Sequence, residues 1–364
     1  MRAKWKTKAS RRRVVRLLSV GIALLVIALC LGLLNQNEQA VEQYYAKGFF
    51  PLFSYGMKII FGWIPFSIGD LVYVGLVWCI LFFIGSAFVI VFKHKFVKGA
   101  VIRLLQLGVF LLAVYVYFYV SWGQNYYRIP LQKQLSLNDT AIKQDDYLAV
   151  VDRYIDSINT MREGIEMGKQ CRIQAEIDIE QLMLASTDKL PMLSRSQVKV
   201  KHPISSHLIS YFTVTGYFNP FTHEVHVNQV MPKTSYPFTV SHELAHQMGI
   251  GLEDECNFVA FLTLHDHPNI WYRYAAYYET VHYLLRPLYY QNRERYNDYV
   301  NRMSDKVRED YRQDHAFWQS YIGWISSLSD MFYGGYLRHN NQPEGAMRYT
   351  LMGRLVVAWE NQKM

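Results

Sequence analysis

The chain has 364 residues, of which 51% are hydrophobic, 15% aromatic and only 19% charged. This composition excludes a disordered protein and is too poor in charge for an ordinary soluble one, and four cysteines are too few for a small scaffold held by disulfides. The net charge of +8 would suggest nucleic-acid binding if the bases were gathered on a folded domain, but their positions argue against that function.

The surplus of basic residues lies beside apolar segments near the N-terminus. Residues 1–16 contain eight Lys or Arg and no acid, and four more bases fall between Lys93 and Arg103. Beyond residue 122 there are 24 bases and 27 acids, so the larger C-terminal part is slightly acidic. Basic residues that flank apolar runs are typical of membrane proteins.

Three runs without a charged residue predict transmembrane helices at about 17–34, 71–92 and 104–122. Their lengths are close to the about 20 residues that a helix needs to cross about 30 Å of hydrocarbon. Buried core helices are the alternative, but three uncharged runs with asymmetric basic flanks favour membrane spans. The first run is too long for the apolar part of a signal peptide and lacks a convincing cleavage site.

We therefore expect a membrane region over residues 1–122 and a separate domain over residues 123–364. The Lys/Arg bias predicts a cytoplasmic N-terminus and a cytoplasmic loop at Lys93–Arg103. Three crossings then place the C-terminal domain outside the cytoplasm, in a multi-pass protein of the cell membrane. The apolar segment Gly48–Gly69 is interrupted by Pro and Gly, and we interpret it as a re-entrant or interfacial element packed on the helices.

The C-terminal domain begins with a helical pattern and continues with strand signals. Apolar residues at helical spacing predict a helix over Asp146–Arg162. Short strands are predicted at Gln197–Lys201 and Leu208–Val214, and a turn leads into an alternating strand at Glu224–Asn228.

Helices dominate the remainder of the domain. A helix is predicted over Pro237–Met248, with Gly249 ending it, and the chain from Glu253 onward is mostly helical. We therefore expect an α+β domain that is mostly helical and contains a small antiparallel or mixed sheet. Cys171 and Cys256 are interpreted as unpaired, buried thiols.

The segment His242-Glu-Leu-Ala-His246 carries the strongest chemical signal. Residues four apart share one face of a helix, so both imidazoles can reach one ion. Neutral imidazoles, a carboxylate and an open position for water suit Zn²⁺, which lowers the pKa of water towards about 7 and polarises a carbonyl. Glu243 lies beside them, where it can accept the proton of that water. Two surface histidines with an ion-paired glutamate are the alternative.

A third protein ligand is required for such a site. The longer motif HExxHxxGxxH would place a histidine at position 252, which is Leu252 here and cannot bind a metal. A glutamate from the following helix is the other possibility. Glu255 is our preferred ligand because it opens a helix whose Phe258 and Phe261 can pack inward, and Glu253 is the alternative. Either acid could instead stabilise the helix N-terminus.

The run HELAHQ followed by E-x-N-F resembles the gluzincin branch of the zincin metallopeptidases. More closely, nearly the whole chain is similar to an uncharacterised domain-of-unknown-function family of bacterial membrane proteins. The similar segments are Asn125–Arg128, Asn219–Asn228 and His242–Phe258. Cys256 stands where that family usually has Ala, and His223 where Gly is common. The resemblance implies a zincin-like metallopeptidase fold and supplies no substrate.

The resemblance also implies roles for later residues. In zincins an edge strand above the metal pairs with the extended substrate, a role that falls here to Glu224–Asn228, whose His226 we interpret as structural. Hydrolysis further needs a donor for the oxyanion. The candidates are Tyr333, Tyr336, Tyr349 and His282. Tyr336 and Tyr333 are preferred because Phe332–Tyr336 contains two glycines and is expected to form a turn that aims a phenol.

Together these features predict a membrane-anchored zinc metallopeptidase that hydrolyses peptides or envelope proteins outside the cytoplasm, with Glu243 as general base. A non-catalytic membrane receptor or envelope assembly factor with a zinc-stabilised domain is the alternative. An intramembrane protease fits poorly because no apolar run of about 20 residues contains the metal motif. The expected partners are the lipid bilayer and a peptide or protein substrate, with no nucleic acid.

Overall fold

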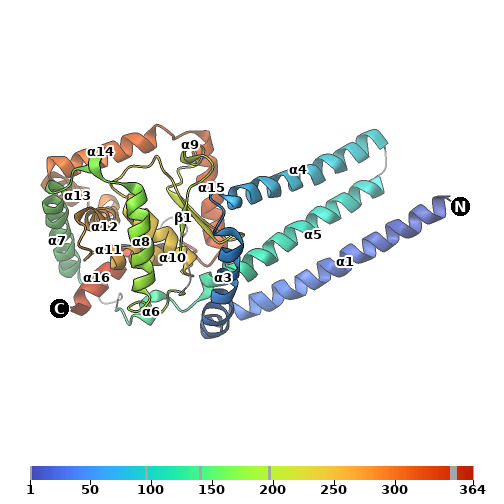
Figure 1. Ribbon diagram of the computed structural model, residues 1–364, viewed down its shortest axis with the longest axis horizontal. Helices are drawn as coiled ribbons and strands as arrows, with labels where there is room; N and C mark the ends of the chain where they lie inside the picture. The colour runs from blue at the N-terminus through green and yellow to red at the C-terminus, as the bar shows by residue number, and fades with distance from the viewer. Residues whose placement is uncertain (1, 95–96, 139–141, 196–197, 345–350, 364) are drawn as a thin grey trace.

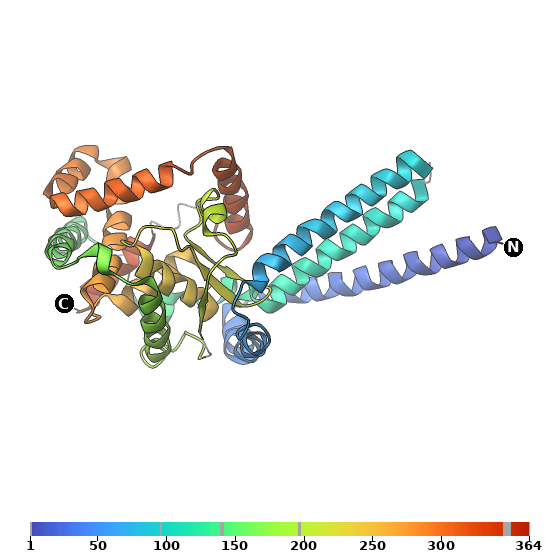
Figure 2. The same cartoon turned by 45° about the horizontal axis from the view of Figure 1, so that its top comes forward.

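The computed structural model describes residues 2–94, 97–138, 142–195, 198–344 and 351–363. Three long helices extend from one side of a mostly helical domain (Figure 1). The N-terminus lies at the far end of these helices, and the C-terminus lies on the opposite side of the domain (Figures 1 and 2).

Three helices are long and apolar enough to cross a membrane. They are Arg11–Leu34 within α1 (Arg2–Leu34), Ile68–Lys93 within α4 (Ile68–His94), and α5 (Val97–Ser121). Most of their apolar side chains are exposed, as expected for surfaces that face lipid. Figure 2 shows α4 and α5 side by side, with α1 approaching α5 at its domain end. The predicted spans are thus confirmed as apolar helices of sufficient length, although Lys98 and Arg103 of the expected loop lie inside α5.

The segment between the first two spans packs on the C-terminal domain. It forms α2 (Glu38–Ala40), the π-helix η1 (Val41–Phe49) and α3 (Phe50–Phe61). Its buried side chains join residues from beyond the third span in one apolar cluster: Val41, Tyr45, Phe50, Trp122, Tyr126 and Leu252. A sharp division of the chain at residue 122 therefore does not describe this segment, which belongs with the domain.

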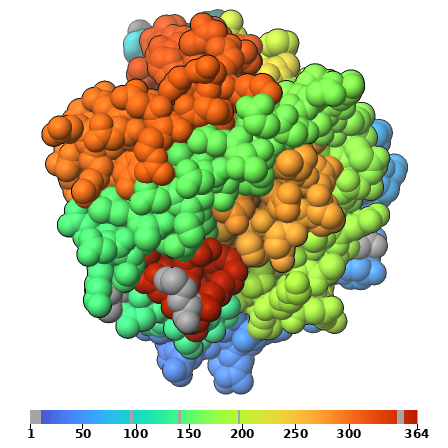
Figure 3. All heavy atoms as spheres, turned by 90° about the vertical axis from the view of Figure 1, so that its left-hand side faces the viewer, coloured from blue at the N-terminus to red at the C-terminus, as the bar shows by residue number. Residues whose placement is uncertain are grey.

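Helices make up most of the domain after the third span. Two short 3-10 helices occur at η2 (Gly123–Tyr127) and η3 (Met167–Lys169). The α-helices are α6 (Leu131–Gln134), α7 (Gln144–Glu163), α8 (Arg172–Ser186), α9 (Ser206–Ser210), α10 (Tyr236–Gln247), α11 (Glu253–Leu264), α12 (Ile270–Gln291), α13 (Arg293–Arg302), α14 (Asp305–Gln319), α15 (Trp324–His339) and α16 (Leu351–Lys363). Figure 3 shows α7 crossing the end of the domain between α14 and α16. The helices predicted over Asp146–Arg162 and Pro237–Met248 are confirmed as α7 and α10.

A small mixed sheet covers one side of α10. Its strands are β1 (Val200–Lys201), β2 (Gly216–Asn219) and β3 (Glu224–Val227), in the order β1-β3-β2. β1 runs parallel to β3, and β2 runs antiparallel to it. The strand predicted at Glu224–Asn228 is therefore confirmed.

Two other strand predictions fare differently. The strand predicted at Leu208–Val214 is wrong, because a short helix, α9, begins there. Ser205 caps this helix by accepting a hydrogen bond from the Leu208 N–H at 3.2 Å. The apolar side chain of Leu208 is exposed. Of the strand predicted at Gln197–Lys201, β1 covers only the last two residues, and Gln197 lies outside the described residues.

α10 is the central helix of the domain, and all twelve of its residues are buried. It packs against the sheet on one side and against α8, α11 and α12 on the others. Pro237 lies in its first turn, where no backbone N–H is needed. Gly249 follows the helix at φ +93°, a conformation that glycine adopts without the steric cost of a Cβ. The predicted stop at Gly249 is thus confirmed.

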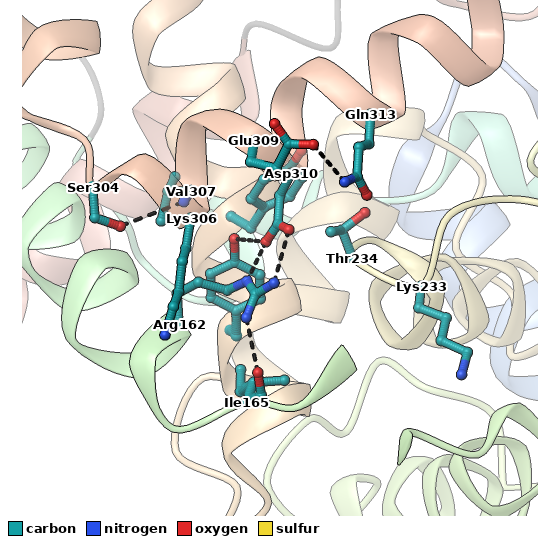
Figure 4. A network of polar contacts seen from close by, with 12 residues as sticks. Arg162, Ile165, Lys233, Thr234, Ser304, Lys306, Val307, Glu309, Asp310 and Gln313 are labelled. Carbon is teal, nitrogen blue, oxygen red and sulfur yellow. Dashed lines mark hydrogen bonds and ion pairs between the residues drawn. The ribbon is translucent and has the colours of Figure 1, made fainter. Parts of the chain in front are cut away.

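A buried ion pair fastens α14 to the body of the domain (Figure 4). Arg162 of α7 donates hydrogen bonds to both carboxylate oxygens of Asp310 on α14, at 2.5 and 3.1 Å. The Tyr274 hydroxyl of α12 donates to the same carboxylate at 2.7 Å. Both charged side chains are largely buried, with 13% and 5% of their surface exposed, so three helices meet at this pair.

Replacing Asp310 with Ala should lower the free energy of unfolding by about 3 kcal/mol, because the Arg162 charge would stay buried without its partner. The matched control is Arg312→Ala, which breaks an exposed pair with Glu309 on the same helix and should leave stability unchanged. Thermal unfolding of the purified full-length protein in detergent measures both. Equal destabilisation by the two variants would contradict this role for Asp310.

Candidate metal centre

His242 and His246 lie one turn apart on α10, and their ring centroids are 4.8 Å apart. The Nε2 atoms of both rings face one oxygen of Glu253, at 3.2 Å from His242 and 3.6 Å from His246. One ligand atom from each of these three residues lies within 4.8 Å of the other two. The three side chains are nearly buried. The structure therefore brings both predicted histidines to a common point.

The second ring nitrogen of each histidine contacts an oxygen atom. The Nδ1 atom of His242 lies 2.7 Å from the Asn257 side-chain oxygen, and that of His246 lies 2.9 Å from the Ile250 carbonyl. Because these oxygens accept hydrogen bonds, each Nδ1 carries a proton, and each ring directs its Nε2 atom towards Glu253. Two such imidazoles and a carboxylate fit the ligand set of Zn²⁺.

Glu253, and not Glu255, completes this group, which corrects the preferred third ligand. α11 begins at Glu253 after the extended residue Leu252, so the two acids point about 200° apart around the helix. The Glu255 carboxylate accepts a hydrogen bond from the Leu131 N–H at 2.6 Å. Phe258 and Phe261 of the same helix are fully buried, as predicted.

The two acids nearest the histidines have opposite electrostatic environments. Burial alone would raise the pKa of the Glu253 carboxyl, but the two imidazoles beside it hold that pKa well below its usual range. Burial raises the pKa of Glu243, and the neighbouring imidazoles oppose this only in part. Among the residues that the structure describes, none donates a hydrogen bond to the Glu243 carboxylate. A buried carboxylate with a raised pKa and no donor suits a proton acceptor.

The three candidate ligands and Glu243 line a cavity of about 1270 Å³. Its walls come from η2, α10, α11, α12, α13, α14, α15 and the segment that contains β2. Tyrosines are frequent on these walls: Tyr126, Tyr217, Tyr278, Tyr283, Tyr289, Tyr290, Tyr296, Tyr311, Tyr333 and Tyr336. The cavity is large enough to hold several residues of a peptide, since ordinary ligand pockets measure about 300–1,000 Å³.

β2 supplies the edge of the sheet at this cavity. β3 is the central strand, so the prediction that Glu224–Asn228 is a free edge is wrong. Within the described residues β2 pairs only with β3, and residues 212–218 line the cavity. A Cβ on Gly216 would lie 2.7 Å from the Glu243 Cγ. Glycine at this position therefore lets the edge strand approach the glutamate closely.

Tyr333 and Tyr336 lie on α15 and not in a turn, which corrects the prediction for Phe332–Tyr336. The Tyr333 hydroxyl donates to the second oxygen of Glu253 at 3.0 Å, and the Tyr336 hydroxyl lies 2.8 Å from that of Tyr126. Both phenols line the cavity, as does His282. Tyr349 lies outside the described residues. An oxyanion role for Tyr336 or Tyr333 stays a prediction.

Residues just after the third span support the far end of α10, a role that the sequence did not reveal. The Trp122 indole N–H donates to the His246 carbonyl at 3.1 Å. The Arg128 guanidinium donates to the Gly249 carbonyl at 2.7 Å and forms a buried ion pair with Glu42 at 2.9 Å. The only sequence feature that pointed to a role for Arg128 was its place in the Asn125–Arg128 segment. Asn257 lay in the E-x-N-F segment, and no role was assigned to it.

The structure accommodates both residues that differ from the usual pattern of the similar family, Cys256 and His223. The Cys256 sulfur lies 3.2 Å from Nδ1 of His246, on the side away from Glu253, and burial raises the pKa of this thiol to about 12. His223 adopts φ 57°, in the left-handed region where glycine is common. Cys171 and Cys256 are unpaired as predicted, but Cys171 is exposed.

His226 lies away from the metal ligands. Its buried ring stacks on Tyr217, with centroids 4.6 Å apart. This position agrees with the structural role that we expected for it.

One protein-family profile matches residues 45–357, and its description is "Protein of unknown function (DUF3810)". No curated protein and no solved structure matches the chain. Because the match extends over most of the sequence, the chain belongs to the DUF3810 family of proteins of unknown function.

Proposed function

We propose that this protein is a membrane-anchored, zinc-dependent peptidase. The observation that carries the proposal is the convergence of two imidazole Nε2 atoms and the Glu253 carboxylate, with the Glu243 carboxylate beside them in a large cavity. A Zn²⁺ ion bound by His242, His246 and Glu253 would supply the Lewis acidity that polarises a substrate carbonyl and acidifies a water molecule.

Glu243 is the general base in this proposal. Its carboxylate accepts a proton as the water oxygen bonds to the carbonyl carbon, and it returns that proton to the amide nitrogen as the C–N bond breaks. The free edge of β2, which lies against Glu243 at Gly216, would hold the substrate backbone by hydrogen bonds of the sheet type. Tyr336 is the phenol proposed to stabilise the oxyanion, and Tyr333, which donates to Glu253, could do so only after its hydroxyl leaves that carboxylate.

Catalysis is favoured over a purely structural metal by the number of ligands. Structural zinc sites are closed by four protein ligands, whereas catalytic sites keep a position open. The described part of the chain offers three ligand residues at this point, and the cavity gives access to them. The alternative is a receptor or assembly factor with a zinc-stabilised domain. It gives no role to the Glu243 carboxylate, which lies beside the ligands and accepts no hydrogen bond from the described residues.

We further propose that the cavity lies outside the cytoplasm of a multi-pass cell-membrane protein. Three helices can span a membrane, and the basic residues gather in residues 1–16 and between Lys93 and Arg103. Since such residues favour the cytoplasmic side, an odd number of crossings leads to an external domain. The substrate would then be a peptide or an envelope protein.

Glu243→Gln should abolish zinc-dependent cleavage and leave zinc bound, because the amide cannot accept a proton while the ligand set stays complete. The assay incubates full-length protein in detergent with a mass-resolved mixture of unstructured peptides, and zinc content is measured on the same samples. Cleavage that persists in Glu243→Gln, or that a chelator does not stop, would exclude this mechanism.

Glu253→Gln should lower zinc affinity by at least about 100-fold, because it removes an anionic ligand. Glu255→Gln is the matched control: glutamine can still accept the Leu131 N–H, so zinc affinity should stay as in the unaltered protein. Competition with a chromogenic chelator measures both. Loss of zinc in Glu255→Gln together with retention of zinc in Glu253→Gln would show that Glu255, the ligand preferred from the sequence, is the third ligand.

A further inference from the structure

One face of α12 leads from the metal ligands to an arginine. Glu279, Tyr283 and Arg286 are spaced four and three residues apart, so they share a face of the helix, and all three line the cavity. α12 packs against α10 and α11, the helices that carry the ligands, and Glu279 accepts a hydrogen bond from the Ser235 hydroxyl at the start of α10. The first two positions therefore lie on a helix that packs against the ligand helices, and Arg286 lies one turn beyond Tyr283 on the same cavity wall.

The Arg286 guanidinium has no protein partner in the part of the chain that the structure describes. No carboxylate pairs with it there and no acceptor is hydrogen-bonded to it, although its side chain is half-buried in the cavity wall. Arg308, the other arginine on these walls, is paired with Asp305. A guanidinium that lines a cavity without a protein partner can pair with an anionic group of a bound ligand.

We propose that Arg286 binds a carboxylate of the substrate, an inference that rests on the peptidase function proposed above. A guanidinium presents a planar fork that holds a carboxylate through two parallel hydrogen bonds. The exposed ring of Tyr290 beside it on the cavity wall offers a flat surface for the adjoining residue of a peptide. An anionic group is thus the feature that this end of the cavity selects.

The position of Arg286 on α12 limits how far the carboxylate lies from the reacting bond. Glu279 and Tyr283, which line the same cavity as the ligands, come seven and three residues before Arg286, which is about 10 and about 5 Å along the helix axis. An extended peptide covers that distance with about one to three residues. A peptide whose scissile carbonyl lies at the metal ligands and whose C-terminal side runs towards Arg286 would place its C-terminal carboxylate there, and the enzyme would release short C-terminal fragments.

The test compares matched mixtures of random peptides with a free or an amidated C-terminus. Zinc-loaded full-length protein in detergent should cleave the free acids at least about 10-fold faster, since hydrogen bonds to charged groups contribute about 1.5–3 kcal/mol. Arg286→Gln should remove this preference by lowering kcat/KM for the free acids only. The matched control Arg308→Gln should keep the preference, and zinc content and thermal unfolding check that both variants are folded.

A second readout measures binding without hydrolysis, by fluorescence anisotropy of the same peptides on the Glu243→Gln variant. Equal cleavage and equal binding of acids and amides, both unaffected by Arg286→Gln, would overturn the carboxylate site and leave the peptidase standing. Arg286-dependent binding of free acids without cleavage by the unaltered protein would support the site and overturn the peptidase. The enzyme could instead prefer peptides with an acidic residue near the cleaved bond, equally for free and amidated C-termini and only when Arg286 is present. That result would support the carboxylate site and assign it to a side chain of the substrate.

Discussion

Two hydrogen bonds donated by the Nδ1–H groups of His242 and His246 determine the geometry of the candidate centre. Each bond fixes the orientation of its ring and leaves Nε2 as the ligand atom, so that both Nε2 atoms point to the same place. The acceptors are Asn257 of α11 and the carbonyl of Ile250 in the turn between α10 and α11. The same turn leads to Glu253 at the start of α11. The packing of α10 against α11 therefore sets the ring orientations and the third ligand together.

Two of the three helices that are long and apolar enough to cross a membrane are connected directly to this arrangement. The Glu224 carboxylate of β3 accepts hydrogen bonds from the Ile68 and Gly69 N–H groups at the start of α4, at 3.3 and 2.5 Å, where the helix dipole favours negative charge. Trp122 and Arg128, which follow α5, hold carbonyls at the end of α10. The sheet is thus hydrogen-bonded to the start of α4, and the central helix α10 to residues that follow α5. Side-chain contacts therefore hold α4, α5 and the domain together.

Features with a periodic signal could be predicted from the sequence, and features that depend on long-range packing could not. The spans, α7, α10 and β3 have clear hydrophobic patterns, and the ligand pair follows from four-residue spacing. The sequence favours Glu255 over Glu253 as a ligand only if the helix begins at Glu255. The helix begins two residues earlier, at Glu253, and a shift of two residues reverses the direction of a side chain. The glycines before Tyr336 suggested a turn, yet α15 tolerates both. The central place of β3 follows from strand order, which no local pattern reports.

X-ray absorption at the zinc edge, on the full-length protein loaded with one equivalent of Zn²⁺, tests the centre most directly. The account predicts two imidazole nitrogens and carboxylate or water oxygens at about 2.0–2.2 Å, with no sulfur. A sulfur scatterer at about 2.3 Å would implicate Cys256 and contradict the assigned tautomer of His246. A signal from a single imidazole, or failure to bind the ion at all, would contradict the convergence of His242 and His246 on which the proposed chemistry depends.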